Sequence, residues 1–221
     1  GIDTGIKDLA ILSDGKVYEN IKPLKTKLKK LKYNQRQLSK KVKGSNSRLK
    51  QKSKLATIHE KVTNIRKDYL HKVSTEIIKN HDVICIEDLA VKNMMKNHKL
   101  AQAFSDVSLG TFYTMLKYKA NWNDKTVVKI DRFFPSSKTC NVCNYINQDL
   151  TLKDREWTCK SCNTVHQRDF NASINIKKQG WKMICCVSGT DSQLKQKRSK
   201  ALPLGESMTS EAQPISFAVG G

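Results

Sequence analysis

The sequence has no apolar run near the length of a membrane-spanning helix, and it begins without the features of a signal peptide. A spanning helix needs about 18 or more consecutive apolar residues, and a secretory signal needs a basic stretch followed by an apolar one. The first residues, Gly1-Ile2-Asp3-Thr4-Gly5, lack both stretches and read as a strand already under way. We therefore expect no membrane partner, a cytoplasmic location of the bacterial type, and a fragment of a longer protein.

Acidic residues are scarce: 20 Asp and Glu stand against 41 Lys and Arg, which gives a formal net charge of +21. Residues 22–54 hold fourteen Lys and Arg and no acid at all. A run of one charge is usually a solvated helix face, but an excess this large repels itself unless a polyanion shares it. The absence of any compensating acid favours contact with phosphates. We therefore expect a nucleic-acid partner.

The seven cysteines do not indicate a disulfide scaffold, because their number is odd and no secretion signal precedes them. Four of them follow the pattern C-x2-C, fifteen residues, C-x2-C, namely Cys140, Cys143, Cys159 and Cys162. This spacing is typical of a zinc ribbon with four thiolate ligands. Two redox dithiols are the alternative. The segment between the pairs has too little apolar content to fold unaided, and structural zinc supplies about 10–16 kcal/mol in such units.

Apolar periodicity predicts a mixed α/β fold, a three-layer arrangement of a sheet flanked by helices. The expected strands lie within 1–20, 82–86 and 127–133. The expected helices are a basic hairpin within 22–80, a helix over 106–120 capped by Asp106 or Ser108, and a helix over 170–178 that Gly180 stops. We expect a polar loop over 91–104, a core position for Cys85 and a disordered tail over 181–221 that includes Cys185 and Cys186.

Three acids stand at the ends of predicted elements in this basic chain: Asp3 in the first strand, Glu87 after a wholly apolar strand, and Asp169 at the start of the last helix. Each has a simpler interpretation, because Asp3 could be a turn residue, Glu87 an exposed strand end and Asp169 a helix N-cap. Brought together, they would repel by roughly 1–4 kcal/mol per pair at about 4 Å. Divalent metal ions would remove this repulsion, and paired Mg²⁺ ions serve phosphodiester hydrolysis in this way.

Four motifs in order resemble the TnpB/OrfB proteins of insertion sequences. The segment from Gly1 to Ala10 resembles the first RuvC motif of the family, and the segment from Ile84 to Leu89 resembles the second. The segment from Phe134 to Cys140 resembles the entry to the zinc ribbon of the family, and the segment from His166 to Ile176 resembles the third motif. The similarity covers about residues 1–180. In this sequence, Gln167 replaces a common acid of the motif, and Asn144 and Asn163 replace the usual glycines.

The resemblance implies an RNase H-like (RuvC) nuclease related to type V CRISPR effectors, with a zinc ribbon inserted before the last helix. It implies metal-dependent hydrolysis of DNA phosphodiesters by an endonuclease that a guide RNA directs, and association with the nucleoid on DNA. Carried over by motif, Asp3, Glu87 and Asp169 are the catalytic acids that hold Mg²⁺, expected as two ions. The four cysteines of the ribbon are the zinc ligands. We expect the N-terminal recognition and wedge region of the family to lie outside this sequence.

The domain organisation that follows has four parts. Residues 1–137 form the nuclease core with the hairpin 22–80, residues 138–165 the zinc ribbon, residues 166–180 the last motif and helix, and residues 181–221 the tail. Two alternatives remain open. One is a zinc-ribbon module that binds nucleic acid without cutting it or assists transposition. The other is a transposase that joins strands, although the lone Tyr69 beside His71 reads as a core residue rather than a nucleophile.

Overall fold

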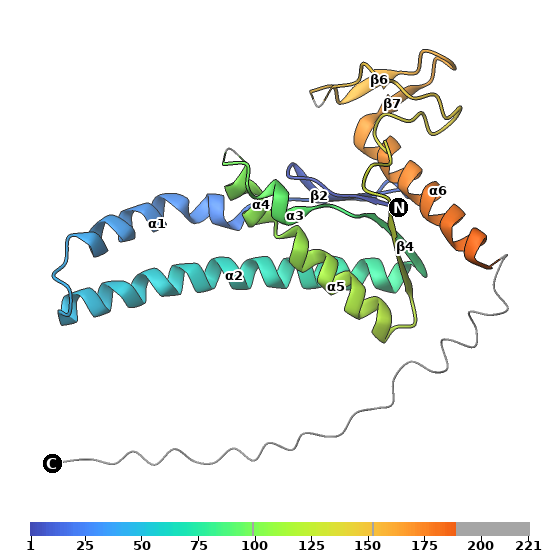
Figure 1. The fold of residues 1–221 in the computed structure, drawn as a ribbon. Coiled ribbons are helices and arrows are strands. Elements are labelled where there is room, and N and C mark those ends of the chain that lie inside the picture. The colour runs from blue at the N-terminus through green and yellow to red at the C-terminus, as the bar shows by residue number, and fades with distance from the viewer. Residues whose placement is uncertain (99, 152, 189–221) are drawn as a thin grey trace. The chain divides into compact units, whose positions relative to one another are not determined.

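The computed structural model describes residues 1–98, 100–151 and 153–188, and the chain divides into a unit of Gly1–Ile184 and a second unit of Cys185–Gly221 (Figure 1). A five-stranded sheet has the order β3-β2-β1-β4-β5. Its strands are β1 (Ile2–Asp3), β2 (Asp8–Leu12), β3 (Val17–Glu19), β4 (Val83–Glu87) and β5 (Thr126–Ile130). The helices are α1 (Pro23–Ser39), α2 (Asn46–Asn80), α3 (Val91–Met94), α4 (Ala101–Val107), α5 (Leu109–Trp122) and α6 (Arg168–Ser188), and β6 (Glu156–Thr158) pairs with β7 (Val165–Gln167).

The sheet is mixed, as the order of strands and helices predicted. β1, β2 and β3 pair antiparallel, and the Asp14-Gly15 turn joins the last two with Gly15 at a φ of 93°. β1, β4 and β5 pair parallel, because helices connect them. The parallel strands β1 and β4 therefore end at the same edge of the sheet.

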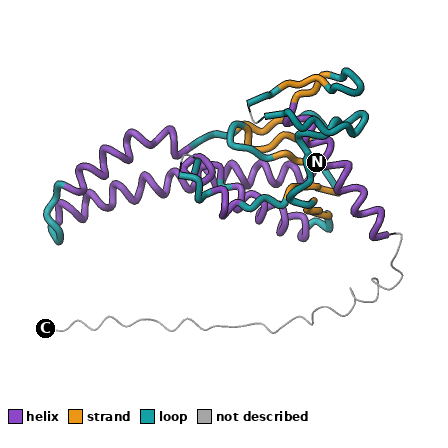
Figure 2. The backbone as a smooth tube through the Cα atoms, turned by 45° about the horizontal axis from the view of Figure 1, so that its top comes forward, coloured by secondary structure: helices purple, strands orange, loops and turns teal. Residues whose placement is uncertain are grey.

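Helices cover both faces of the sheet, which confirms the predicted mixed α/β architecture (Figure 2). Side chains of β4 alternate between the faces: Ile84 and Ile86 pack into the larger core with α2 and α5, whereas Cys85 packs with Ile130 and with Ile176 of α6. Cys85 is thus a core residue, as predicted. This alternation fixes the register of β4, because a one-residue slip would exchange the two faces.

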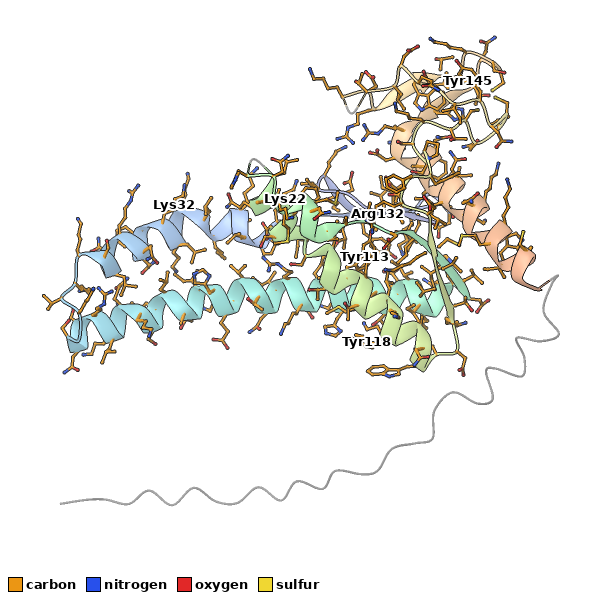
Figure 3. All side chains as sticks on the ribbon, viewed as in Figure 1. Lys22, Lys32, Tyr113, Tyr118, Arg132 and Tyr145 are labelled. Atoms are coloured by element: carbon orange, nitrogen blue, oxygen red, sulfur yellow. The ribbon has the colours of Figure 1, made fainter. Side chains whose placement is uncertain are left out.

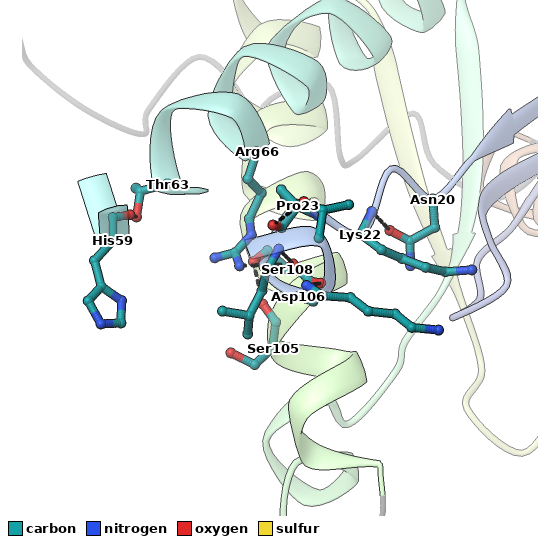
Figure 4. A network of polar contacts seen from close by, with 12 residues as sticks. Asn20, Lys22, Pro23, His59, Thr63, Arg66, Ser105, Asp106 and Ser108 are labelled. Atoms are coloured by element: carbon teal, nitrogen blue, oxygen red, sulfur yellow. Dashed lines mark hydrogen bonds and ion pairs between the residues drawn. The ribbon is translucent and has the colours of Figure 1, made fainter. Parts of the chain in front are cut away.

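The basic hairpin is present as predicted, and α1 packs along α2 (Figures 1 and 2). A buried acid fastens its base: Asp106 accepts hydrogen bonds from the backbone N–H groups of Leu24 and Lys25 at 3.0 and 3.1 Å (Figure 4). Asp106 also forms an ion pair with Arg66 of α2 at 3.2 Å. It therefore caps α1. The sequence-based expectation that Asp106 or Ser108 caps the helix near 106–120 was wrong, since the Ser108 hydroxyl donates to Ser105 instead.

Two other expectations need correction. Residues 91–104 are not simply a polar loop, because α3 and much of α4 lie within them. Phe104 and Val107 of α4 are buried against the larger core, and these apolar residues stabilise a helix that the polar composition concealed. The strand predicted over 127–133 is β5, which ends at Ile130 because a turn follows.

The last helix is much longer than predicted. α6 runs to Ser188 and passes through Gly180, so residues 181–188, with Cys185 and Cys186, are helical rather than part of a tail. The rest of the predicted tail lies outside the described residues. Gly180 serves close packing, because a Cβ at that position would lie 2.7 Å from the Cβ of Cys85. No described helix is both long and apolar enough to cross a membrane.

We expect Gly180→Ala to destabilise the protein although alanine is the better helix former. The added methyl group would push α6 away from β4, and overpacking of this kind costs about 1–3 kcal/mol. Thermal unfolding measures the effect, with Gly110→Ala as the control because nothing lies within 4 Å of a Cβ built at Gly110. A Gly180→Ala variant that unfolds at a higher temperature than the Gly110→Ala variant would contradict this packing argument.

Candidate active site

Asp3 and Glu87 lie side by side at the ends of the two central parallel strands. Ile2 of β1 is in register with Ile86 of β4, so the next residue of each strand, Asp3 and Glu87, follows at the same edge. Asp3 is therefore a strand residue rather than a turn residue. Glu87 is half-buried and accepts a hydrogen bond from the Ser136 hydroxyl, so it is not an exposed strand end.

Asp169 reaches the same pocket from the first turn of α6 and is held by two guanidinium groups. Arg155 contacts one carboxylate oxygen at 2.7 Å, and Arg168 contacts the other at 2.8 Å. The β6–β7 ladder brings the two arginines together, because Glu156 pairs with Gln167 and the Arg155 carbonyl accepts from the Arg168 N–H at 2.7 Å. Asp169 follows the first helical residue, so it is not the N-cap that the simpler interpretation required.

The three acids line one open pocket of about 720 Å³. α3, α4 and the turn between them supply apolar and amide side chains to the same pocket, and the zinc-ribbon segment supplies Arg155. Burial, reinforced by the negative charges of Glu87 and Asp169, raises the pKa of Asp3 well above its usual range. Burial likewise raises the pKa of Glu87. Both carboxylates would therefore be stabilised in their charged form by a bound cation.

The carboxylates face one pocket without forming a closed ligand cluster. Within the described ranges, the group of cysteines in the ribbon is the one set of three or more Cys, His or acidic side chains gathered closely enough to hold an ion. Asp169 is engaged by Arg155 and Arg168, and Glu87 by Ser136. A cation entering the pocket would compete with the two arginines for Asp169, whereas Ser136 contacts one of the two Glu87 oxygens.

The four cysteines form a cluster that could hold zinc, with their sulfur atoms all within 4.8 Å of one another. Each C-x2-C pair begins a matching turn. The backbone N–H of Asn144 donates to the Cys140 carbonyl at 3.0 Å, and the backbone N–H of Asn163 donates to the Cys159 carbonyl at 2.9 Å. Both asparagines adopt the left-handed conformation, with φ values of 63° and 57°. Asn tolerates this conformation better than other residues with a side chain, which explains how the turns form without glycine.

The donor set of the ribbon fits zinc on electrostatic grounds as well. Hydrogen bonds from Thr164 lower the pKa of Cys162 to about 6, whereas burial raises the pKa of Cys140 to about 11. Zinc binds thiolates, so it would displace the proton from Cys140 and find Cys162 largely ionised at neutral pH. The His166 ring lies 3.0 Å from the Cys140 sulfur and packs against Trp157, so it can support this sulfur from outside the cluster.

Sequence reasoning missed two groups: Arg155, which lines this pocket, and Tyr113, which contacts the pocket residue Thr4. Arg155 directly precedes β6, the strand that leads to Cys159, and this position was the one sequence signal that could have identified it. Tyr113 of α5, labelled in Figure 3, shares a 2.5 Å hydrogen bond with Thr4, the residue after Asp3. Burial and the nearby acids raise the pKa of Tyr113, so it stays neutral. The sequence alone could not predict the contact between Thr4 and Tyr113, because these residues lie 109 positions apart.

We expect Arg155→Ala to lower any activity of this pocket by about 10–100-fold. The variant lacks the guanidinium that would donate a charge-assisted hydrogen bond to a phosphate entering the pocket, and such a bond contributes roughly 1.5–3 kcal/mol. Lys153→Ala, two residues away and exposed, is the control. Equal rates for the two variants would show that Arg155 acts only as a surface charge.

Two family models match parts of this chain. A family model described as "Probable transposase" (OrfB of the IS605 type) matches residues 1–98, and a "Cas12f1-like, TNB domain" model matches residues 110–176. A Streptomyces pristinaespiralis protein named "Putative RNA-guided DNA endonuclease" is 42% identical over 199 residues, which is 90% of this chain and 49% of that protein. The Escherichia coli K12 relative InsQ, named in the same way, is 35% identical over 201 residues, covering 84% of this chain and 50% of that protein.

Solved structures show the same fold. A Cas12f1 chain in a cryo-EM complex with single guide RNA and target DNA superimposes with a TM-score of 0.54 at 19% identity, over 80% of this chain and 48% of that one. A CRISPR-Cas12f chain from a ternary complex gives a TM-score of 0.55 at 21% identity, over 80% and 37%. The chain spans about half the length of the relatives it matches. Its motifs, its two family matches and its relatives establish that the chain belongs to the TnpB/OrfB family.

Proposed function

We propose that this chain is the nuclease part of a transposon-associated, RNA-guided DNA endonuclease with an RNase H-like (RuvC) fold. The strand order β3-β2-β1-β4-β5, with three antiparallel strands followed by two parallel ones, supports the RNase H-like assignment. The names of the relatives support the activity. The guide RNA and the target DNA are proposed partners, since the relatives extend well beyond this chain.

One observation carries the proposal: Asp3, Glu87 and Asp169 line one pocket, although any two of them lie 82 to 166 positions apart in the sequence. Hard oxygen donors of this kind suit Mg²⁺, which takes few protein ligands and leaves room for substrate phosphate. Bound there, Mg²⁺ would supply Lewis-acid stabilisation of the reacting phosphate and activation of water. We propose two such ions as the catalytic cofactor.

The protein's own groups would prepare the pocket for a phosphodiester. The sheet register places the two strand acids next to each other, so the backbone that carries them needs no loop reorganisation. Arg155 lies on the rim with half of its side chain exposed and can pair with a phosphate oxygen once Asp169 turns to a cation. The apolar side chains of Leu100 and Phe104 line the same pocket and would keep bulk water from part of it.

The experiment that tests this function is product analysis on labelled single-stranded DNA with zinc-loaded protein. Hydrolysis predicts shortening of the DNA that requires added Mg²⁺, and no product longer than the substrate. Products longer than the substrate would reveal strand joining and favour a transposase. Retention of DNA without any cutting in Mg²⁺ would favour a binding module.

We propose zinc as the structural cofactor of the ribbon, held by Cys140, Cys143, Cys159 and Cys162. The proximity of the four sulfur atoms supports this assignment. The ribbon has only a small apolar core of its own, in which Leu150 and Trp157 pack against the cysteines, so metal would supply much of its stability.

We propose that the α1–α2 hairpin contacts a nucleic-acid backbone. Within the described part of the chain, none of the fourteen basic side chains of 22–54 forms an ion pair with an acid. Most of them are exposed, including Lys32 on α1 (Figure 3). These cations are therefore available to phosphates.

Replacing Lys25, Lys29 and Lys32 together by Gln should weaken nucleic-acid binding and make it less sensitive to salt. If each lysine meets one phosphate, the slope of log K against log salt should fall by about 2–3. The control replaces Lys16, Lys72 and Lys125 by Gln. These three lysines already pair with acids, namely Glu76, Asp68 and Asp82. Fluorescence anisotropy at several salt concentrations measures both slopes, and identical slopes for the two triple variants would refute a backbone-binding role for the hairpin.

A further inference from the structure

A turn at the entrance to the zinc ribbon touches one of the proposed catalytic acids, Glu87. The turn is closed by Thr139, whose N–H and hydroxyl both donate to the Pro135 carbonyl at 3.0 and 2.8 Å. Within the turn, the buried Ser136 donates its hydroxyl to Oε1 of Glu87. One oxygen of Glu87 is therefore directed by a residue that belongs to another segment of the chain, 49 positions away.

Two asparagines of α6 fasten this turn from the other side. The amide of Asn175 donates to the Ser136 carbonyl at 2.9 Å and to the Thr139 carbonyl at 2.6 Å. The amide of Asn171 donates to the same Thr139 carbonyl at 2.7 Å, and its oxygen accepts from the Asn141 N–H at 3.0 Å.

Both asparagines are almost fully buried, with exposed fractions of 1% for Asn171 and 3% for Asn175. A buried amide without partners is costly, so these hydrogen bonds hold α6 and the turn in one arrangement. Thr139 precedes Cys140, and Asp169 stands two residues before Asn171. These hydrogen bonds therefore connect three parts of the protein: the start of the ribbon next to Cys140, the first turn of α6 with Asp169, and the Glu87 carboxylate.

We propose that Ser136 is a positioning residue for Glu87, and that Asn175 of α6 holds Ser136 in place for this task. The inference rests on the proposed function of Glu87 as a metal-holding acid. Ser136 occupies Oε1 with a hydrogen bond and so leaves the other carboxylate oxygen oriented for the cation. Partners of this kind, which orient a ligand without touching the metal, commonly change metal affinity by 10–100-fold.

The test measures Mn²⁺ binding by electron paramagnetic resonance, with the zinc-loaded 221-residue chain and no nucleic acid. Ser136→Ala is expected to weaken Mn²⁺ binding about tenfold. Ser136→Thr keeps the hydroxyl and should restore affinity to within about twofold of the original. Asn175→Leu, which is similar in size but donates no hydrogen bond, should weaken binding in the same direction.

The double variant makes the test specific. If Asn175 acts through Ser136, then Ser136→Ala combined with Asn175→Leu should bind Mn²⁺ no more weakly than the weaker single variant. Zinc content and melting temperature are measured in parallel, and the exposed Ser53→Ala on α2 serves as the matched serine control. Ser136→Ala leaves packing nearly unchanged, so it remains informative even if Asn175→Leu fails to fold.

Glu87→Gln separates the possible failures. Unchanged Mn²⁺ binding in Ser136→Ala, together with lost binding in Glu87→Gln, would overturn the positioning role and leave the metal site standing. Failure of Ser136→Thr to restore affinity, or fully additive losses in the double variant, would also overturn it. Unchanged Mn²⁺ binding in Glu87→Gln would overturn the metal site, and this inference with it.

Discussion

Glu87→Gln in the zinc-loaded protein is expected to reduce Mg²⁺-dependent cutting of single-stranded DNA by about a thousandfold or more. The substitution keeps the shape and the Ser136 contact but removes the negative charge that would hold the cation. A catalytic metal contributes several kcal/mol of transition-state stabilisation, and each 1.36 kcal/mol corresponds to a tenfold change in rate. Initial rates on a fluorescently labelled strand, at saturating Mg²⁺, measure the loss.

Asp88→Asn is the matched control for this result. Asp88 is the next residue in the chain and also acidic, but it pairs with Lys129 and Arg132 outside the pocket. Loss of these half-exposed ion pairs should change the rate by less than about threefold, because exposed pairs contribute little. A Glu87→Gln variant that retains rates close to those of Asp88→Asn would contradict the catalytic assignment of Glu87.

Cys159→Ser is expected to abolish zinc binding and unfold the ribbon while the main sheet stays folded. Loss of one of four thiolates removes most of a binding free energy of about 10–16 kcal/mol, and the small core around Trp157 cannot replace it. Metal analysis should fall from one zinc per chain to near zero. The emission of Trp157, which is 7% exposed, should shift to longer wavelength as its environment becomes polar.

Two controls isolate this signal. Cys85→Ser changes a cysteine outside the cluster and should keep the zinc, although it places a hydroxyl in the α6 contact. Trp157→Phe should remove the spectral shift, since the other two tryptophans, Trp122 and Trp181, are 75% and 56% exposed already. A Cys159→Ser protein without zinc whose Trp157 emission stays unshifted would contradict the structural role of the metal.

The sequence carried most of the architecture, because local signals were strong where they mattered. The Asp14-Gly15 turn, the apolar β4 strand and the cysteine spacing each have a short-range physical cause, and each is present in the structure. The left-handed Asn144 and Asn163 also follow from the knuckle geometry that the spacing implies. The predicted strand ends, in contrast, located the acids in the sequence but did not indicate which side chains would contact them.

The features that could not be predicted depend on contacts distant in sequence. Gly180 looked like a helix end, but its role is to admit the Cys85 side chain. Asp106 looked like the cap of the next helix, but it caps α1, more than 80 residues earlier. Arg155 reaches Asp169 only because the β6–β7 ladder places it beside Arg168. In each case, tertiary packing decided between local interpretations that were equally reasonable.

The most direct test of the central claim is to locate Mn²⁺ by anomalous scattering in crystals of the zinc-loaded protein. The account predicts anomalous density in the pocket, in contact with carboxylate oxygens of Asp3, Glu87 and Asp169, with the guanidinium of Arg155 displaced from Asp169. Anomalous density at other sites, with the Asp169 ion pairs intact and no ion in the pocket at saturating Mn²⁺, would contradict it.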